Sequence, residues 1–297
     1  MKVHEINSVP QDTIMSAVCE NRFVLASWDC KLCLYSSDAL ELIKQVCSDS
    51  PVTRVILSSG TEEGDDSIRV ITGDIEGKVC MYDGFLNKTK EIQSGVGGIQ
   101  FLHQCGSTIV VGGWNKKIVF IESSGIRNTL DTDGKIHCSA IIGDILICGQ
   151  HNSVVGYNIS NCSVFFRRLF DMPVRSLAIH ASGFFAGTTS GRIYYEDFAN
   201  GDNSYVFNAH YDISGEVKTF YPVNALVIHK HLYSGGSDGK LLRWRLGSKK
   251  TCKVMHTQAV GVSSICTKTN RLFVTFSYTH DNGQIDKYSS KAFAIDI

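Results

Sequence analysis

A short pattern of apolar and polar residues recurs along the whole chain. Each copy has an apolar run, a turn rich in Gly, Ser, Asp or Asn, and an alternating run that ends at or near an aromatic residue. An apolar run, a tight turn and an alternating run indicate two neighbouring strands of a sheet. The copies lie at residues 23–35, 68–82, 108–121, 145–157, 183–196, 232–244 and 271–297.

The spacing of the copies predicts the architecture. The first six copies end at residues 35, 82, 121, 157, 196 and 244, and these steps centre on the roughly 40–45-residue period of a WD-repeat propeller blade. Seven such blades need about 280–315 residues, and the chain has 297. The sequence therefore predicts an all-β, seven-bladed WD-repeat β-propeller that occupies residues 1–297 as a single domain. Residues 3–6 are expected to close the ring as the outer strand of the last blade, beside the C-terminal strand.

The pattern is degraded in one respect and interrupted in two places. Trp28-Asp29 has the signature dipeptide of the repeat, but its position predicts a turn rather than the end of a strand. The acidic segment 58–67 is interpreted as a solvated loop, with a docking site for a basic partner as the alternative. The insertion 198–218 mixes aromatic and polar residues, and part of it is expected to pack against the propeller.

Composition excludes several classes of partner and compartment. The 29 basic and 29 acidic residues balance, so the chain has no bulk attraction for nucleic acid or an anionic membrane. No apolar run reaches the length of a membrane span, and the start lacks an apolar signal core. The 11 cysteines, an odd number, are expected to be reduced side chains of a cytosolic or nuclear protein. Cys30 and Cys33 have no second pair at zinc-finger spacing, which favours packing over a metal site.

One motif suggests an enzyme. Residues 235–239 match the G-x-S-x-G nucleophile elbow around Ser237, which requires a following helix. Leu242, Trp244 and Leu246 alternate instead as a strand would, so a blade turn is favoured. The sequence predicts no catalytic residue, no metal ligand and no cofactor.

Three stretches are similar to those of one known family. They are Ala-Ser-Trp-Asp-Cys-Lys-Leu-Cys-Leu-Tyr at 26–35, Ser-Gly-Arg-Ile at 190–193, and Tyr-Pro-Val-Asn at 221–224, followed by Leu-Tyr-Ser-Gly-Gly-Ser-Asp-Gly at 232–239. On these residues the chain resembles, from end to end, a divergent member of the Bub-type propellers of the spindle assembly checkpoint. The sister Rae-type RNA-export propellers share most of these features. Those propellers typically carry an N-terminal extension that this sequence does not show, and they tend to have Ala where this chain has Pro222. Both differences favour the checkpoint family. A substrate receptor of a ubiquitin ligase is a more distant alternative.

The resemblance implies a non-catalytic adaptor of mitosis. Such propellers bind a GLEBS-type peptide of a checkpoint kinase, or of its pseudokinase relative, on one face. By position, Trp28, Arg175 and Arg192 are the residues implied for this peptide site. The family also implies a monomeric propeller in hetero-complexes, without nucleic acid or membrane, in the nucleus, at the kinetochore in mitosis and in the cytoplasm.

The resemblance implies a second site, for phosphothreonine in MELT-type repeats of a kinetochore scaffold. Lys230 matches a basic position of the family, and His210 and Tyr211 are expected to assist it. Tyr211 stands where the family has an arginine, so one of two basic groups is missing. A phosphate held by a single lysine is expected to bind weakly and with strong salt dependence.

Overall fold

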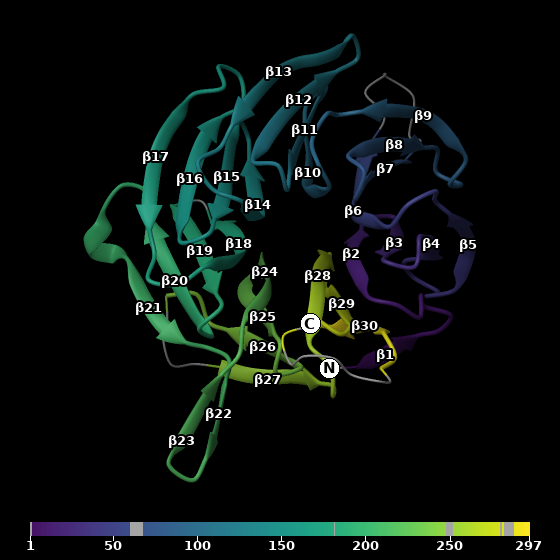
Figure 1. Cartoon of the computed structure of the whole chain (residues 1–297). Helices are drawn as coiled ribbons and strands as arrows, with labels where there is room; N and C mark the ends of the chain where they lie inside the picture. The colour runs from purple at the N-terminus through teal and green to yellow at the C-terminus, as the bar shows by residue number, and fades with distance from the viewer. Residues whose placement is uncertain (1, 60–67, 181, 248–251, 280, 282–287) are drawn as a thin grey trace. The chain divides into compact units, whose positions relative to one another are not determined.

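The computed structural model describes residues 2–59, 68–180, 182–247, 252–279, 281 and 288–297. Seven four-stranded sheets contain almost all of its strands (Figure 1). Each predicted copy of the repeat supplies the two middle strands of one sheet. The sheets are called the first to the seventh in chain order. The chain forms two compact units, residues 1–136, 266–275 and 290–297 as unit 1 and residues 137–265 and 276–289 as unit 2.

Unit 1 contains the first three sheets and most of the seventh. The first is β2 (Ile14–Cys19), β3 (Arg22–Ser27), β4 (Lys31–Ser36) and β5 (Leu42–Cys47). The second is β6 (Val52–Ser59), β7 (Ile68–Asp74), β8 (Lys78–Tyr82) and β9 (Lys88–Gln93). The third is β10 (Ile99–Cys105), β11 (Thr108–Gly113), β12 (Lys117–Glu122) and β13 (Gly125–Asp131). The seventh is β28 (Val262–Lys268), β29 (Arg271–Phe276), β30 (Lys291–Asp296) and β1 (Val3–Ile6).

Unit 2 contains the other three sheets and a separate hairpin. The fourth sheet, which begins at the boundary of the unit, is β14 (Ile136–Ile142), β15 (Ile145–Gln150), β16 (Ser153–Asn158) and β17 (Val164–Leu169). The fifth is β18 (Val174–His180), β19 (Gly183–Thr188), β20 (Arg192–Asp197) and β21 (Tyr205–Asn208). The sixth is β24 (Val223–His229), β25 (His231–Gly236), β26 (Lys240–Trp244) and β27 (Cys252–Thr257). The hairpin is β22 (Tyr211–Ser214) with β23 (Val217–Phe220), and one short helical turn, η1 (Gly201–Asn203), precedes β21.

The N-terminal strand completes the seventh sheet, as predicted. β1 pairs antiparallel with β30, in a register that places Val3 opposite Ile295 and Ile6 opposite Ala292. The core beside these strands includes Phe23 and Phe273, whose rings stack with centroids 4.7 Å apart. The first and last parts of the chain are therefore held together within unit 1 by backbone hydrogen bonds and by a shared core.

Burial follows the position of a strand in its sheet. Middle strands such as β11 and β19 are buried at every residue, whereas the outer strand β9 is exposed at five of its six residues. A strand covered on both faces needs apolar residues throughout, while an outer strand meets solvent. This is why the repeat is visible in the sequence at the middle strands and fades at the outer ones.

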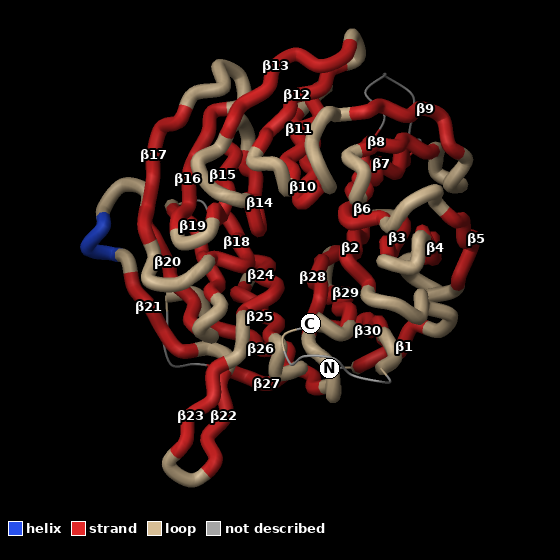
Figure 2. Tube along the Cα trace, viewed as in Figure 1, coloured by secondary structure: helices blue, strands red, loops and turns tan. Residues whose placement is uncertain are grey.

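The insertion 198–218 has two parts with different structures. Its first part ends in β21, which pairs with β20 as the outer strand of the fifth sheet and buries Phe207. Its second part enters the hairpin of β22 and β23, which projects from the sheets of unit 2 (Figure 2). The expectation that only part of this segment packs against a sheet is confirmed. Of the acidic segment 58–67, residues 60–67 lie outside the described residues.

Two motif assignments are settled by the turns that contain them. Trp28 and Asp29 lie in the turn between β3 and β4, as predicted. Ser237 lies in the turn between β25 and β26, and the chain continues as a strand rather than as the helix that a nucleophile elbow requires. The G-x-S-x-G match is therefore a blade turn.

Candidate functional site

The turn between β3 and β4 presents Trp28 at the surface. Its side chain is 39% exposed, and its backbone N–H donates to the carbonyl oxygen of Thr13 at 2.9 Å. Asp29 accepts a hydrogen bond from Ser27 and lies 2.8 Å from the Nζ of Lys31. Burial raises the pKa of Asp29, but these hydrogen bonds outweigh it and hold the pKa below its usual value. The turn is therefore fixed on both sides of an indole that remains accessible.

A second tryptophan occupies the equivalent turn of the third sheet. Trp114 lies between β11 and β12 and is also 39% exposed. Its Nε1 donates to Oε1 of Gln100 at 2.9 Å, and Nζ of Lys135 lies 5.9 Å from the centroid of its ring. A Cβ at Gly98 would lie 2.5 Å from the ring, so the backbone approaches the indole closely. The sequence interpretation did not single out Trp114. The signal was present, because Trp-Asn at 114–115 and Trp-Asp at 28–29 occupy the same turn of the repeat.

Arg175 and Arg192 lie at the same end of the fifth sheet. Arg175 is the second residue of β18 and Arg192 is the first residue of β20. β18 and β20 both run antiparallel to β19, which lies between them, so both strands begin at the same end of the sheet. Two strand spacings separate β18 from β20 by roughly 9–10 Å. The structure therefore brings the two predicted arginines together in unit 2, whereas Trp28 belongs to unit 1.

The guanidinium of Arg175 is already paired with a carboxylate of the chain. Its two terminal nitrogens lie 2.9 Å and 3.4 Å from the two oxygens of Asp281. Asp281 also accepts hydrogen bonds from the hydroxyl groups of Ser237 and Thr279. A carboxylate from a ligand would therefore have to replace Asp281 at Arg175.

The residues predicted to hold a phosphate are not brought together. Lys230 is exposed at the turn between β24 and β25, with a φ of 56°. The ring of His210 lies against Gly236, which pairs with Val223 at the opposite end of β24. A strand of seven residues spans roughly 20 Å, so Lys230 is remote from both His210 and the adjoining Tyr211.

Tyr211 opens the hairpin rather than facing Lys230. Its ring lies 3.9 Å from the Nζ of Lys218, measured to the ring centroid, and 6.0 Å from the ring of Phe220. These contacts join the two strands of the hairpin through a cation–π pair and an aromatic pair. A basic group therefore lies beside Tyr211, but it is the ammonium of Lys218, which packs on the tyrosine ring.

His210 is the centre of a buried hydrogen-bond chain. Its side chain is fully buried, with Nδ1 2.8 Å from Oδ1 of Asp238 and Nε2 2.8 Å from Oγ of Ser234. The indole Nε1 of Trp244 donates to the same Oγ at 2.9 Å. One proton assignment satisfies all three contacts: Trp244 donates to Ser234, Ser234 donates to Nε2, and Nδ1–H donates to Asp238. A phosphate could reach the imidazole only after these bonds broke, so the phosphate site proposed below rests on Lys230.

The buried chain has the residue types of a catalytic triad but not the access. Ser234 and His210 are 0% exposed, and the side chain of Asp238 is 1% exposed. A nucleophile must meet its substrate within hydrogen-bond reach, which full burial prevents here. These hydrogen bonds instead connect the segment after β21 to the middle strands of the sixth sheet.

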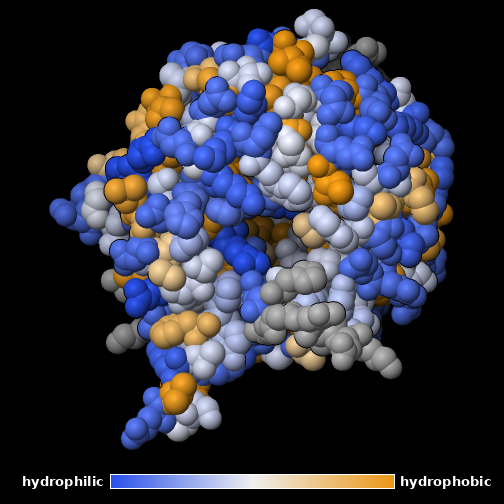
Figure 3. Space-filling view, viewed as in Figure 1, coloured by the Kyte–Doolittle hydropathy of each residue, from blue (hydrophilic) through white to orange (hydrophobic). Residues whose placement is uncertain are grey.

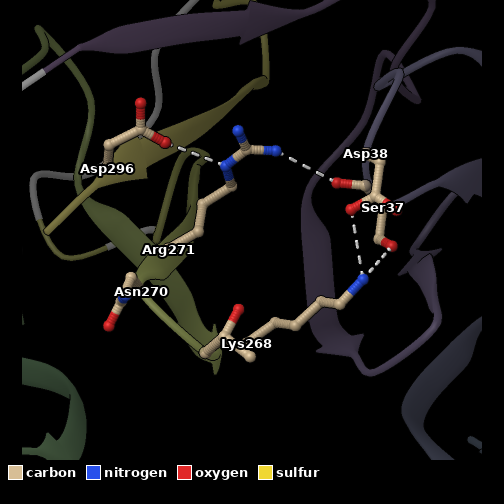
Figure 4. Close-up of a pocket in the computed structure, with 7 residues that line it drawn as sticks. Ser37, Asp38, Lys268, Asn270, Arg271 and Asp296 are labelled. Carbon is tan, nitrogen blue, oxygen red and sulfur yellow. Dashed lines mark hydrogen bonds and ion pairs between the residues drawn. The ribbon is translucent and has the colours of Figure 1, made fainter.

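A pocket of about 250 Å³ in unit 1 is lined by charged and polar groups (Figure 4). Lys268 donates to the hydroxyl of Ser37 at 2.6 Å and lies 3.2 Å from Asp38. Arg271 donates from Nε to Asp296 at 3.0 Å, and this hydrogen bond lowers the pKa of that carboxyl group. Each cation of the pocket is therefore paired within the chain.

The 11 cysteines are all free thiols in the structure. Burial raises the pKa of Cys19 to about 12 and that of Cys33 to about 11, so both remain protonated and unreactive at neutral pH. Among the described residues, no three His, Cys, Asp or Glu side chains are grouped as metal ligands would be. In the same part of the chain, no helix has the length and apolar character needed to cross a membrane.

The sheets and their turns define a seven-bladed WD-repeat β-propeller. The fold is similar to the solved structure titled "Structure of U3-55K", with a TM-score of 0.81 and 9% identity over 99% of this chain and 98% of that one. It is also similar to "Crystal structure of RRP9 WD40 repeats", with a TM-score of 0.79 and 10% identity over 99% and 97% of the two chains. At these identities the likeness establishes the fold alone.

Two curated relatives are similar to the chain in sequence along most of its length. The chain is 23% identical over 319 residues to "Mitotic checkpoint protein bub3" of Dictyostelium discoideum, which covers 99% of this chain and 94% of that protein. It is 23% identical over 271 residues to "Spindle assembly checkpoint protein bub3" of Schizosaccharomyces pombe, which covers 85% and 82%. No protein-family model matches the chain. The resemblance to the Bub-type checkpoint propellers, inferred from three stretches of sequence, is confirmed by these relatives.

Proposed function

We propose that this protein is a non-catalytic adaptor of the mitotic spindle assembly checkpoint. The observation that carries the proposal is the similarity to two checkpoint proteins, one of which aligns with 99% of the chain. The buried Ser–His–Asp chain supports a binding role, because its hydroxyl group has no access to a substrate. The proposed places of action are the nucleus, the kinetochore in mitosis and the cytoplasm.

The partner proposed for the first surface is a GLEBS-type peptide of a checkpoint kinase or its pseudokinase relative. Trp28 supplies an accessible indole on a fixed turn, and Trp114 supplies a second one in the same unit. Tryptophan and arginine anchors dominate the binding energy of many peptide interfaces. Arg192 and Arg175 offer bidentate contacts to acidic residues of the peptide, with Arg175 exchanging Asp281 for the ligand.

Replacement of Trp28 by alanine is expected to weaken binding of a GLEBS-type peptide by about 2 kcal/mol, or roughly 30-fold in Kd, because an anchoring indole is lost. Arg192→Glu is expected to weaken the same complex by about 10-fold or more through charge repulsion. Calorimetry with the full chain measures both. Phe85→Ala removes an aromatic side chain that is 62% exposed elsewhere in unit 1, and it should leave the affinity unchanged. Unchanged affinity in both Trp28→Ala and Arg192→Glu would remove these residues from the site.

The second proposed partner is a phosphothreonine peptide of MELT type, bound through Lys230. Because one exposed lysine provides the charge, Lys230→Glu is expected to abolish the difference in affinity between phosphorylated and plain peptide. The preference for phosphate should also fall steeply as salt rises. Calorimetry with both peptides measures this difference, and Lys253→Glu on exposed β27 is the charge control. Equal binding of the two peptides to the unmodified protein would exclude the phosphate site.

The set of copurifying proteins separates the checkpoint role from other propeller functions. A checkpoint kinase recovered by affinity purification and mass spectrometry supports the proposal. Recovery of a nucleoporin in its place would indicate an RNA-export adaptor, and recovery of ligase subunits would indicate a substrate receptor.

A further inference from the structure

The outer strand of the fourth sheet exposes an unusual amount of apolar surface. In β17, Val164 is 56%, Phe165 48% and Leu169 76% exposed. The outer strands of the other sheets carry at most two exposed large apolar side chains each, and β9 carries none within the described chain. β17 is also the last strand of its sheet, and among the described residues it has a partner strand on one side only. An exposed apolar edge of this kind is a template for pairing with another chain. Figure 3 shows apolar residues along the outer margin where β17 runs.

The pairing of β17 with β16 sorts its side chains onto two faces. Val164, Arg167 and Leu169 lie opposite alternate residues of β16 and therefore share one face. Phe166 and Arg168 share the other face, where Phe166 stacks on Phe184 with centroids 5.8 Å apart and Arg168 lies 3.8 Å from Glu196. Phe165 falls at a shift in the register, and its ring contacts that of Phe166 at 4.9 Å.

The charges at the middle of β17 select the occupant of the edge. Arg167 and Arg168 are adjacent and both exposed, and they point to opposite faces. An antiparallel pair of two copies of β17 centred on Arg167 or on Arg168 would place arginine opposite arginine, which is destabilising. A peptide with two consecutive acidic residues at this place would instead meet one arginine on each face. Apolar residues on either side of the acidic pair would lie opposite Phe166 and Leu169.

We propose that β17 is a docking edge for an extended peptide with the pattern apolar–acidic–acidic–apolar, which adds a fifth strand to the fourth sheet. Main-chain hydrogen bonds supply the affinity of such an addition, and the alternating side chains supply its specificity. The pattern reads the same in both directions, so parallel and antiparallel addition satisfy it equally. This edge contains none of the residues of the proposed GLEBS and phosphothreonine sites.

The test uses the full chain and a fluorescein-labelled peptide with Leu-Asp-Glu-Val at the centre of a Ser/Thr-rich sequence. Fluorescence anisotropy is expected to show saturable binding to the unmodified protein. The affinity should fall at least 10-fold in the Arg167→Glu/Arg168→Glu variant and in Leu169→Lys. The peptide Leu-Lys-Lys-Val should not bind. Lys90→Glu changes the charge of the exposed outer strand β9 and is expected to leave the affinity unchanged. Absence of binding, or equal binding to the double-arginine variant, overturns the proposal.

Strand addition is separated from simple charge attraction by methylating the peptide backbone one nitrogen at a time. Because alternate N–H groups of an added strand face its neighbour, methylation should weaken binding at every second position only. A uniform response along the peptide overturns the strand model. A single-stranded RNA that binds with the same arginine dependence while the peptide does not, or a dimer that Leu169→Lys dissociates in analytical ultracentrifugation, would assign the edge to a different occupant.

Discussion

Replacement of His210 by alanine is expected to lower the free energy of unfolding by about 3–5 kcal/mol, because it removes a hydrogen bond to a buried carboxylate, worth about 1.5–3 kcal/mol, and leaves the buried Ser234 hydroxyl without its acceptor, which costs about 1–3 kcal/mol more. Both ring nitrogens of His210 make contacts of 2.8 Å, and no part of its side chain is exposed. The substitution leaves Asp238 buried with only Lys240 nearby, since Oδ2 of Asp238 already lacks a hydrogen-bond partner among the described residues and lies 3.7 Å from Nζ of Lys240. Asp238 keeps the backbone N–H of Lys240, which donates to its Oδ1 at 3.2 Å, but it loses the shorter hydrogen bond from the imidazole, which is costly for a buried carboxylate.

Urea denaturation of the full chain measures this loss, and each kcal/mol should also lower the Tm by about 2–4 °C. Trp244→Phe keeps an aromatic ring but removes the N–H that donates to Ser234, and it should cost about 1 kcal/mol. His210→Ala/Asp238→Ala should cost less than the sum of the two single variants, because the second change removes the stranded carboxylate. A loss below about 1 kcal/mol for His210→Ala would contradict the structural role.

The middle strands were predictable because burial on both faces constrains them. Residues such as Val110 and Phe185 lie in sheets that are covered by their neighbours, so apolar runs and turn glycines repeat at the period of a blade. Outer strands meet solvent and tolerate most residues. β17 and β9 therefore carry no common pattern, and the exposed apolar edge of β17 emerged only from the structure.

The assignments around His210 show what a sequence pattern lacks. A histidine in a polar insertion gives no sign that Ser234 and Asp238, 24 and 28 residues away, will close on its ring. That contact depends on the register of β25 and on the turn that follows it, which are tertiary properties. The length of β24 separates His210 from Lys230, whereas the resemblance to a family predicts both beside one phosphate. Trp114 was missed for the opposite reason, because its repeat position was visible but its exposure was not.

Gly191→Ala is expected to destabilise the protein by about 2–5 kcal/mol, since left-handed backbone costs a non-glycine residue about 1–2 kcal/mol and forced displacement of packed atoms adds about 1–3 kcal/mol. Gly191 has a φ of 70° and precedes the proposed peptide contact Arg192. An added Cβ would lie 2.3 Å from the carbonyl oxygen of His210 and 3.0 Å from that of Tyr221. Neither oxygen belongs to a flexible side chain, so the backbone itself must move.

That movement is resisted because the carbonyl oxygen of Gly191 accepts hydrogen bonds from the N–H groups of Ala209 and His210 at 2.8 Å and 3.1 Å. The matched control is Gly215→Ala in the hairpin, where φ is 58° and no atom lies within 4 Å of the added Cβ. The control variant measures the cost of left-handed backbone alone, about 1–2 kcal/mol. Urea denaturation gives the loss of stability in each variant. The difference between the two losses is the cost of displacing the segment that carries His210. Equal losses of stability in the two variants would show that the segment carrying His210 moves without cost. The effect expected for His210→Ala would then come from the hydrogen bonds of the imidazole and not from a fixed backbone.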